Sequence, residues 1–139
     1  MASKWQKLLS QFSDKFMEKK IKTAAENFLK ILGIFDCSLE IFLVPDSIMR
    51  DINREYRGKD KATNVLSFEA AAMPCLSKAA LPLGTIYLAP KYITDHNEDI
   101  RYLLLHGILH LLGYTHEQGA RKAKAMEQKE KEVISKARF

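Results

Sequence analysis

Three histidines at fixed spacing constrain this chain more than any other feature. His106, His110 and His116 lie within eleven residues, and the stretch 102–115 contains no Asp, Glu, Lys or Arg. Residues four apart share one face of an α-helix, so the imidazoles of His106 and His110 can reach one ion. Gly113 can adopt the left-handed conformation that ends a helix, which lets the chain turn back and bring His116 to the same ion. The stretch therefore predicts a buried helix whose histidine edge faces a cleft.

The ligand types favour a catalytic zinc site over a structural one. Three neutral imidazoles around one Zn²⁺ leave a fourth coordination position open, and we expect one zinc per chain. The spacing matches the zinc-hydrolase pattern H-E-x-x-H-x-x-G-x-x-H, except that Gly107 replaces the glutamate that serves as general base in peptidases. Peptidase activity is therefore discounted. The alternatives are a closed structural zinc site and a metal-free helix whose histidines are hydrogen-bonded in the core.

Length and composition are those of one soluble domain. With 139 residues, of which 47% are hydrophobic, the chain is long enough to bury a core, and we expect a single domain over 1–139. No apolar run approaches the ~20 residues that a membrane span needs. The N-terminus also lacks the apolar core of a signal peptide. We expect a cytoplasmic protein with no membrane partner.

Positive charge is concentrated at the two ends of the chain. Residues 1–33 contain seven lysines and three acidic residues, and residues 117–139 contain seven basic and four acidic residues. A positive surface attracts polyanions, so nucleic acid is one natural partner. Solvated helix faces that only keep the protein soluble are the alternative.

Hydrophobic periodicity predicts helices and strands that alternate along the chain, and hence one layered domain of the α+β class. Asp95 followed by Glu98 resembles a capping box at the start of the histidine helix. The expected elements are one or two helices over 5–33, a strand over 39–43, a helix over 46–56 capped by Asp46 and ended by Gly58, a strand over 63–68, a loop over 70–82, a strand over 84–88, a helical turn from Pro90, the histidine helix over 102–115 and a surface helix after Glu117.

Four ordered motifs resemble the YbeY family of bacterial ribosomal RNA maturation factors, which are metal-dependent single-strand endoribonucleases. The matching stretches are NREYRGKD at 53–60, VLSF at 65–68 after Thr63, LG at 83–84 with Ile86, and the histidine stretch at 106–116, with Met126-Glu127 as an echo. The resemblance extends from about Asp46 to the C-terminus.

The resemblance implies both a fold and a set of site residues. It implies a mixed sheet of about four strands packed by helices, with a topology related to that of zinc peptidases. It also implies zinc on His106, His110 and His116, and a functional arginine at Arg57 beside the metal cleft. The activity it implies is maturation of small-subunit rRNA at the 3′ end and ribosome quality control. The expected partners are single-stranded RNA, rRNA and the small ribosomal subunit.

Several positions depart from the usual family pattern. Asn64, Thr85 and Thr115 each replace an aspartate, and Ala62 and Glu69 each replace a proline. The first three changes remove carboxylates expected near the cleft. The hydrogen-bond partners that orient the imidazoles are therefore not identified from the sequence.

Arg57 and His106 are the candidate catalytic residues. Guanidinium stays charged and can hold phosphate oxygens with two donors, so Arg57 is suited to neutralise charge on a phosphodiester. Lys59 and Lys61 on the same loop either follow the RNA strand or are ordinary solvated side chains. The sequence does not identify the general base, for which Glu117 is one candidate. It also does not decide whether the RNA 2′-OH itself attacks the phosphodiester.

Three functions follow, in decreasing order of support. The first is a zinc-dependent endoribonuclease that acts on ribosomal RNA. The second is a ribosome- or RNA-binding protein whose metal only holds the fold. The third is a metallopeptidase-like hydrolase, which would need a base that Gly107 cannot provide.

Overall fold

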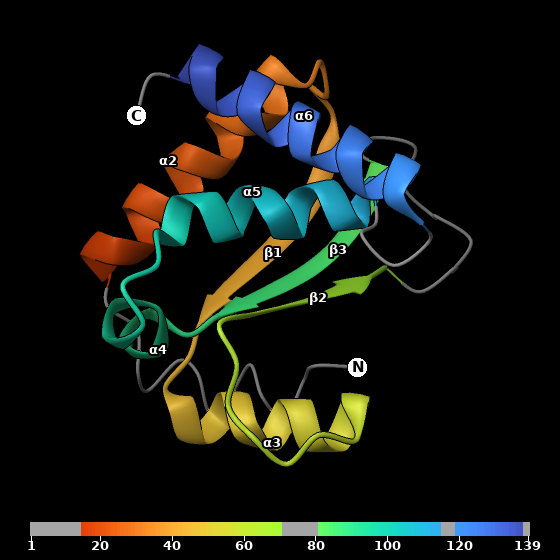
Figure 1. Cartoon of the computed structure of the whole chain (residues 1–139). Helices are drawn as coiled ribbons and strands as arrows, with labels where there is room; N and C mark the ends of the chain where they lie inside the picture. The colour runs from red at the N-terminus through yellow and green to blue at the C-terminus, as the bar shows by residue number, and fades with distance from the viewer. Residues whose placement is uncertain (1–14, 71–80, 115–118, 138–139) are drawn as a thin grey trace.

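A mixed three-stranded sheet forms the centre of the chain (Figure 1). The computed structural model describes residues 15–70, 81–114 and 119–137. Strand β3 (Leu81–Leu88) is central, parallel to β1 (Cys37–Leu43) and antiparallel to β2 (Val65–Glu69). The α+β class and the mixed sheet are confirmed. The resemblance implied about four strands, whereas the described residues contain three, and the relation to zinc peptidases stays a prediction.

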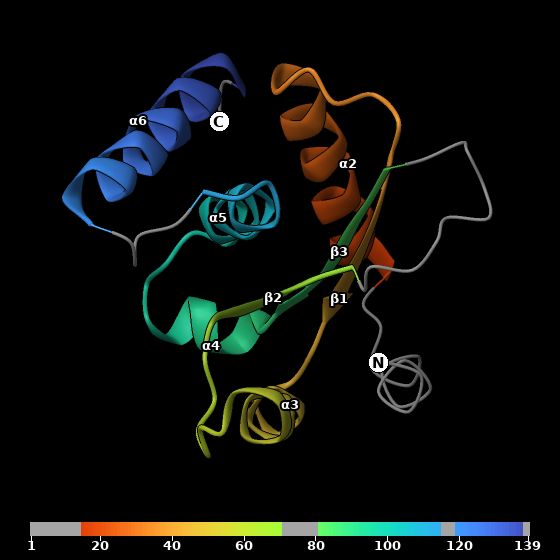
Figure 2. The same cartoon turned by 90° about the vertical axis from the view of Figure 1, so that its right-hand side faces the viewer.

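Each face of the sheet is covered by helices, because side chains along β3 alternate between two cores. Ile86 and Leu88 belong to the core shared with α2 (Lys15–Ile31), α5 (Ile100–Leu111) and α6 (Ala120–Ala137). Tyr87 belongs to the core shared with α3 (Asp46–Arg57). Figure 2 shows α3 on one side of the sheet and α2, α5 and α6 on the opposite side. The result is a layered arrangement with β3 at its centre.

Helix α3 (Asp46–Arg57) carries one of the matched motifs to the edge of the sheet. Its buried Met49 and Ile52 pack against the sheet, and the helix ends at Gly58, which has φ +71°. The predicted end at Gly58 is therefore confirmed. The predicted cap is wrong, since Pro45 occupies the N-cap position and Asp46 is already helical.

Helix α5 (Ile100–Leu111) is the predicted histidine helix, and it is buried between the sheet and the other helices. Asp99 caps it by accepting a hydrogen bond from the Arg101 backbone N–H at 2.9 Å. The predicted capping box is wrong because Asp95 ends the short helix α4 (Pro90–Asp95), where it pairs with Lys91.

The other predicted helices and strands that fall on described residues have the correct type, but their bounds differ from those in the structure. Helix α2 confirms the helical stripe from Lys15 onward, and residues 5–14 lie outside the described part of the chain. Strand β3 begins at Leu81, so the predicted loop over 70–82 extends too far. The rest of that loop, 71–80, is not described. No helix within the described ranges is long and apolar enough to cross a bilayer.

Helix α6 (Ala120–Ala137) corrects the prediction of a surface helix after Glu117. Its outer face is charged, but Met126, Glu130 and Val133 are buried against α2 and α5. These three residues recur at helical spacing, so one stripe of α6 belongs to the core. Glu130 is the charged member of that stripe.

Candidate metal centre and cleft

His106 and His110 converge on one point at the edge of α5. Their Nε2 atoms lie 3.0 Å apart, and the two rings stand at 71° to each other. Two nitrogens that bind one tetrahedral Zn²⁺ lie roughly 3.3 Å apart, so this separation fits a shared ion. The other side chains of the helix are mainly buried leucine and isoleucine, which fixes the direction in which the histidine edge points.

The chain turns immediately after the two histidines, as the sequence predicted. Gly113 has φ +99°, its N–H donates to the His110 carbonyl at 3.0 Å, and the Tyr114 N–H donates to the Leu109 carbonyl at 3.0 Å. A left-handed glycine with these two backbone hydrogen bonds ends the helix. His116 lies outside the described residues, so its place as the third ligand stays a prediction.

A buried carboxylate from α6 reaches the first histidine. His106 Nδ1 donates to Glu130 Oε1 at 2.9 Å, and the Tyr102 hydroxyl donates to Glu130 Oε2. Glu130 is only 2% exposed. Its hydrogen bond to Tyr102, with partial burial and the charges of Glu130 and Glu127, raises the pKa of Tyr102 to about 12. Tyr102 therefore remains a neutral donor at physiological pH.

Sequence reasoning missed Glu130, although a signal was present. The residue lies on the same helical stripe as Met126 and Val133, and an acidic residue on an apolar stripe must find a partner when that stripe is buried. Which partner it finds depends on the packing of α6 against α5. The contact joins residues 24 positions apart.

Gly107 is explained by helix–sheet packing. A Cβ atom at this position would lie 3.1 Å from Ile86 Cδ1 and 3.4 Å from Ile86 Cγ2 on the central strand. The glycine lets α5 approach β3 closely, with the histidines on the adjacent edge. The position occupied by glutamate in the zinc-hydrolase pattern therefore faces the sheet at close range, which gives a packing reason for the missing base.

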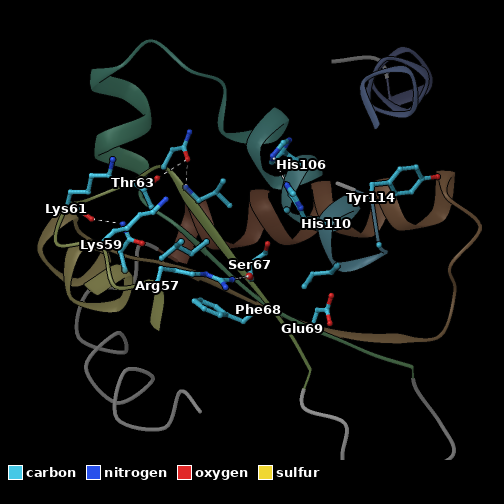
Figure 3. Close-up of a pocket in the computed structure, with 17 residues that line it drawn as sticks. Arg57, Lys59, Lys61, Thr63, Ser67, Phe68, Glu69, His106, His110 and Tyr114 are labelled. Atoms are coloured by element: carbon cyan, nitrogen blue, oxygen red, sulfur yellow. Dashed lines mark hydrogen bonds between the residues drawn. The ribbon is translucent and has the colours of Figure 1, made fainter. Parts of the chain in front are cut away.

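The histidine edge forms one wall of a cleft of about 980 Å³ (Figure 3). The last turns of α3, the segment that joins α3 to β2, strand β2 and the turn after α5 form the rest of the lining. The lining residues are Asn53, Arg57, Lys59, Lys61, Thr63, Asn64, Val65, Leu66, Ser67, Phe68, Glu69, His106, Gly107, His110, Leu111, Gly113 and Tyr114. The matched motifs at 53–60 and 65–68, far from the histidines in sequence, thus meet them in one cleft.

Arg57 is held against strand β2 by two contacts. Its Nη2 donates to the Ser67 carbonyl at 2.8 Å, and its guanidinium carbon lies 4.6 Å from the centre of the Phe68 ring. Phe68 is buried, so the ring gives the cation a fixed apolar platform. The structure brings Arg57 into the same cleft as His106 and His110, whereas its catalytic role stays a prediction.

The loop after α3 adds two more cations to the cleft. Lys59 and Lys61 both line it, and the buried Asn53 amide donates to the Lys61 carbonyl at 2.8 Å. Arg50 and Arg54 hold Asp60 from the outer side at 2.8 Å and 3.4 Å. These exposed ion pairs each contribute little to stability, but together with Asn53 they fix the path of the loop.

The amide at position 64 supports the loop–strand junction. Asn64 Oδ1 accepts from the Val65 backbone N–H at 2.7 Å, and its Nδ2 donates to the Glu98 carboxylate at 3.1 Å. Thr115, another of the positions that lack the expected aspartate, lies outside the described residues. Within the described ranges, Glu130 on α6 supplies a carboxylate that reaches an imidazole.

The fold and the cleft define an α+β protein with a candidate metal centre beside a cationic wall. Comparison with known proteins places it more narrowly. The family model described as "Endoribonuclease YbeY" matches residues 3–138, and the chain belongs to this family. The family resemblance noted in the sequence is confirmed.

Individual relatives agree along most of the chain. The endoribonuclease YbeY of Persephonella marina is 36% identical over 137 residues, covering 92% of this chain and 89% of the relative. That of Nautilia profundicola is 39% identical over 109 residues, covering 73% of each. A solution structure of a protein from Thermotoga maritima has a TM-score of 0.56 and 28% identity, and the match covers 90% of this chain and 83% of that one.

Proposed function

We propose that the chain, as one domain over 1–139, is a zinc-dependent endoribonuclease that cleaves single-stranded RNA. The observation that carries this proposal is the meeting of two converging imidazoles and a guanidinium in one cleft. Family membership supports the nuclease class, since the relatives are named endoribonucleases. The cellular role we propose is 3′ maturation of small-subunit rRNA and ribosome quality control in the cytoplasm.

Three histidines would hold the metal. His106 and His110 already present Nε2 atoms at a separation suited to one ion, and His116 follows after the turn at Gly113. When bound there, zinc would supply Lewis acidity toward water and toward a phosphoryl oxygen of the RNA. The donor set of neutral imidazoles fits zinc, and zinc has no redox chemistry that would damage RNA.

Arg57 would bind and orient the phosphodiester. A guanidinium has five N–H donors, and the bond to the Ser67 carbonyl uses one of them. The remaining donors form a planar fork that matches two phosphate oxygens. Because the Ser67 carbonyl and the Phe68 ring hold the guanidinium in place, Arg57 can neutralise charge that builds on the phosphate without first being ordered.

The other lining residues suit a flexible polyanion. Lys59 and Lys61 extend the cationic wall beyond Arg57, and the half-buried Tyr114, which packs against the core, also lines the cleft. Proteins usually bind single strands with cationic side chains that contact the phosphate backbone and with aromatic rings on which the unpaired bases stack. This combination supports single-stranded RNA, including rRNA on the small ribosomal subunit, as the substrate.

The test is metal content and RNA cleavage measured on the same preparations. We expect the purified chain to contain about one zinc and to cut single-stranded RNA, and His110→Ala to lose both because a ligand is removed. His96→Ala, an exposed histidine that stacks on Tyr92, is the matched control and should keep both. Equal cleavage by His110→Ala and the parent protein would assign the activity to a contaminating nuclease. The product ends decide the nucleophile, because a 2′,3′-cyclic phosphate indicates the RNA 2′-OH.

One observation favours the alternative of a structural metal in an RNA-binding protein. The His106–Glu130 bond ties α5 to α6, so a metal that fixes the orientation of His106 would also stabilise this contact between the two helices. Under this alternative, chelation collapses the thermal unfolding transition and the reloaded protein binds RNA without cutting it. Under the enzymatic proposal, a folded zinc-loaded protein cuts RNA.

A further inference from the structure

The buried Glu130 carboxylate is more than a core residue. Placing a carboxylate at 2% exposure costs free energy unless every oxygen is hydrogen-bonded, and an apolar side chain at this position in the α6 stripe would avoid that cost. Both oxygens have partners that lead to α5, namely the ring of His106 and the hydroxyl of Tyr102. The carboxylate therefore points at the histidine edge and away from solvent.

This contact determines which nitrogen of His106 carries the proton. A carboxylate oxygen accepts hydrogen bonds, so the bond at 2.9 Å requires the hydrogen on Nδ1. In the neutral ring the lone pair then lies on Nε2, and this is the atom that faces His110 Nε2 at 3.0 Å. Without such a partner a neutral histidine exchanges between its two tautomers, and only one of these can bind an ion through Nε2.

Tyr102 holds the carboxylate in turn. Its hydroxyl donates to the second oxygen of Glu130, and Tyr102 lies one helical turn before His106 on α5. The carboxylate is thus gripped by two side chains of α5, which sets its rotation as well as its position. The chain of contacts runs from Tyr102 through Glu130 to His106.

We propose that Glu130 is the positioning residue of the metal centre, which with Tyr102 fixes the Nδ1–H tautomer and the orientation of His106. The inference rests on the proposed function only in taking a metal ion as the ligand. Partners of this kind, one step beyond the ligands, typically contribute 10–100-fold to metal affinity. Glu130 touches neither the RNA nor the reacting atoms in this scheme.

The primary test is the protonation pattern of His106 in the zinc-loaded full chain, read by ¹⁵N NMR of the imidazole nitrogens. We expect a protonated Nδ1 in a hydrogen bond and a metal-bound Nε2. A metal-bound Nδ1 or a protonated Nε2 would overturn the proposal. This measurement needs no variant, so it stands even where a substitution prevents folding.

The second test compares zinc affinities by chelator competition, with RNA absent. Glu130→Gln keeps the size of the side chain and removes its charge, and we expect zinc binding about 10–100-fold weaker. Glu132→Gln, on the exposed face of α6, is the matched control and should bind zinc as the parent does. Glu130→Gln with parental affinity would overturn the proposal. A chain that shows the expected tautomer and affinities but cuts no RNA would instead overturn the proposed function alone.

Discussion

The two walls of the cleft are held in place by different kinds of interaction. On the histidine wall, α5 is buried except along its cleft edge and near its N-terminus, and His106 is oriented by a carboxylate that is itself buried. On the cationic wall, Arg57, Lys59 and Lys61 are exposed and are positioned by a helix end, a loop and surface ion pairs. One wall is suited to holding a single ion in fixed geometry. The other is suited to contacting a flexible strand whose shape varies.

This contrast decides how substitutions should behave. Leaving a buried polar group without its partner costs about 1–3 kcal/mol, and more where the group is charged. Exposed ion pairs contribute only about 0–1 kcal/mol each. Changes on the histidine wall should therefore act on metal binding and folding together. Changes on the cationic wall should act on RNA and leave the metal and the fold intact.

The sharpest test of this separation is Arg57→Ala. We expect kcat to fall by about 10²–10³-fold, the usual effect of removing one preorganised donor to a charged transition state. Zinc content and the thermal midpoint should stay at parental values. Arg57→Lys keeps a positive charge but loses the planar fork, so its kcat should lie between that of the parent protein and that of Arg57→Ala. A loss of bound zinc in Arg57→Ala that matches its loss of kcat would show that the two walls are not independent.

Gly107→Glu tests the packing of the histidine wall. The substitution restores the zinc-hydrolase pattern, but its Cβ would meet Ile86 at 3.1 Å, so we expect a loss of about 1–3 kcal/mol in unfolding free energy. Urea denaturation measures this loss. Peptide substrates should not be cleaved. Zinc-dependent peptide turnover with parental stability would instead revive a peptidase function.

Lys59→Ala combined with Lys61→Ala tests the cationic wall alone. Each phosphate contact that is lost should lower the steepness of the log–log salt dependence of RNA binding by roughly 0.7 for a single strand. Fluorescence anisotropy at several salt concentrations gives this slope. Lys91→Ala, whose side chain pairs with Asp95 on α4, should leave it unchanged. An unchanged slope in the double variant would place the RNA elsewhere on the surface.

Two tyrosines report on the walls separately in the alkaline range. A bond to Glu130 raises the pKa of Tyr102 to about 12, whereas burial under the cationic wall raises that of Tyr87 to about 12. Both favour the neutral phenol, so their contribution to stability is complete below pH ~10 and is lost as the pH rises through 12. In an absorbance titration, Glu130→Gln should lower the pKa of Tyr102 and leave that of Tyr87 unchanged. Parallel shifts of both would indicate a global change.

Local periodicity was enough to predict much of this structure. The apolar stretch with two histidines four apart predicted a buried helix, and the glycines at 58 and 113 predicted turns that the structure contains. The resemblance added Arg57 to the same cleft. Each of these predictions depends on residues within a few positions of one another, or on a family pattern that already encodes the tertiary fold.

The features that could not be predicted depend on a choice between competing local signals or on contacts between residues far apart in the sequence. Asp95 and Asp99 are both plausible caps, and the sequence cannot decide between them before the lengths of α4 and α5 are known. Pro82 suggested a loop, but it lies in β3 beside a shift in the register with β1, where a missing N–H is tolerated. The Glu130 contact requires α6 to lie across α5, which no local pattern specifies.

The origin of Glu130 in the last described helix has a consequence for the timing of synthesis. Both histidines of α5 leave the ribosome before the residue that orients one of them, so a nascent chain carries ligands that are not yet aligned. Competence for cutting RNA would then arise only after α6 has emerged and docked. Under the proposed rRNA-processing function, the enzyme would thus stay inert while it is still attached to the ribosome.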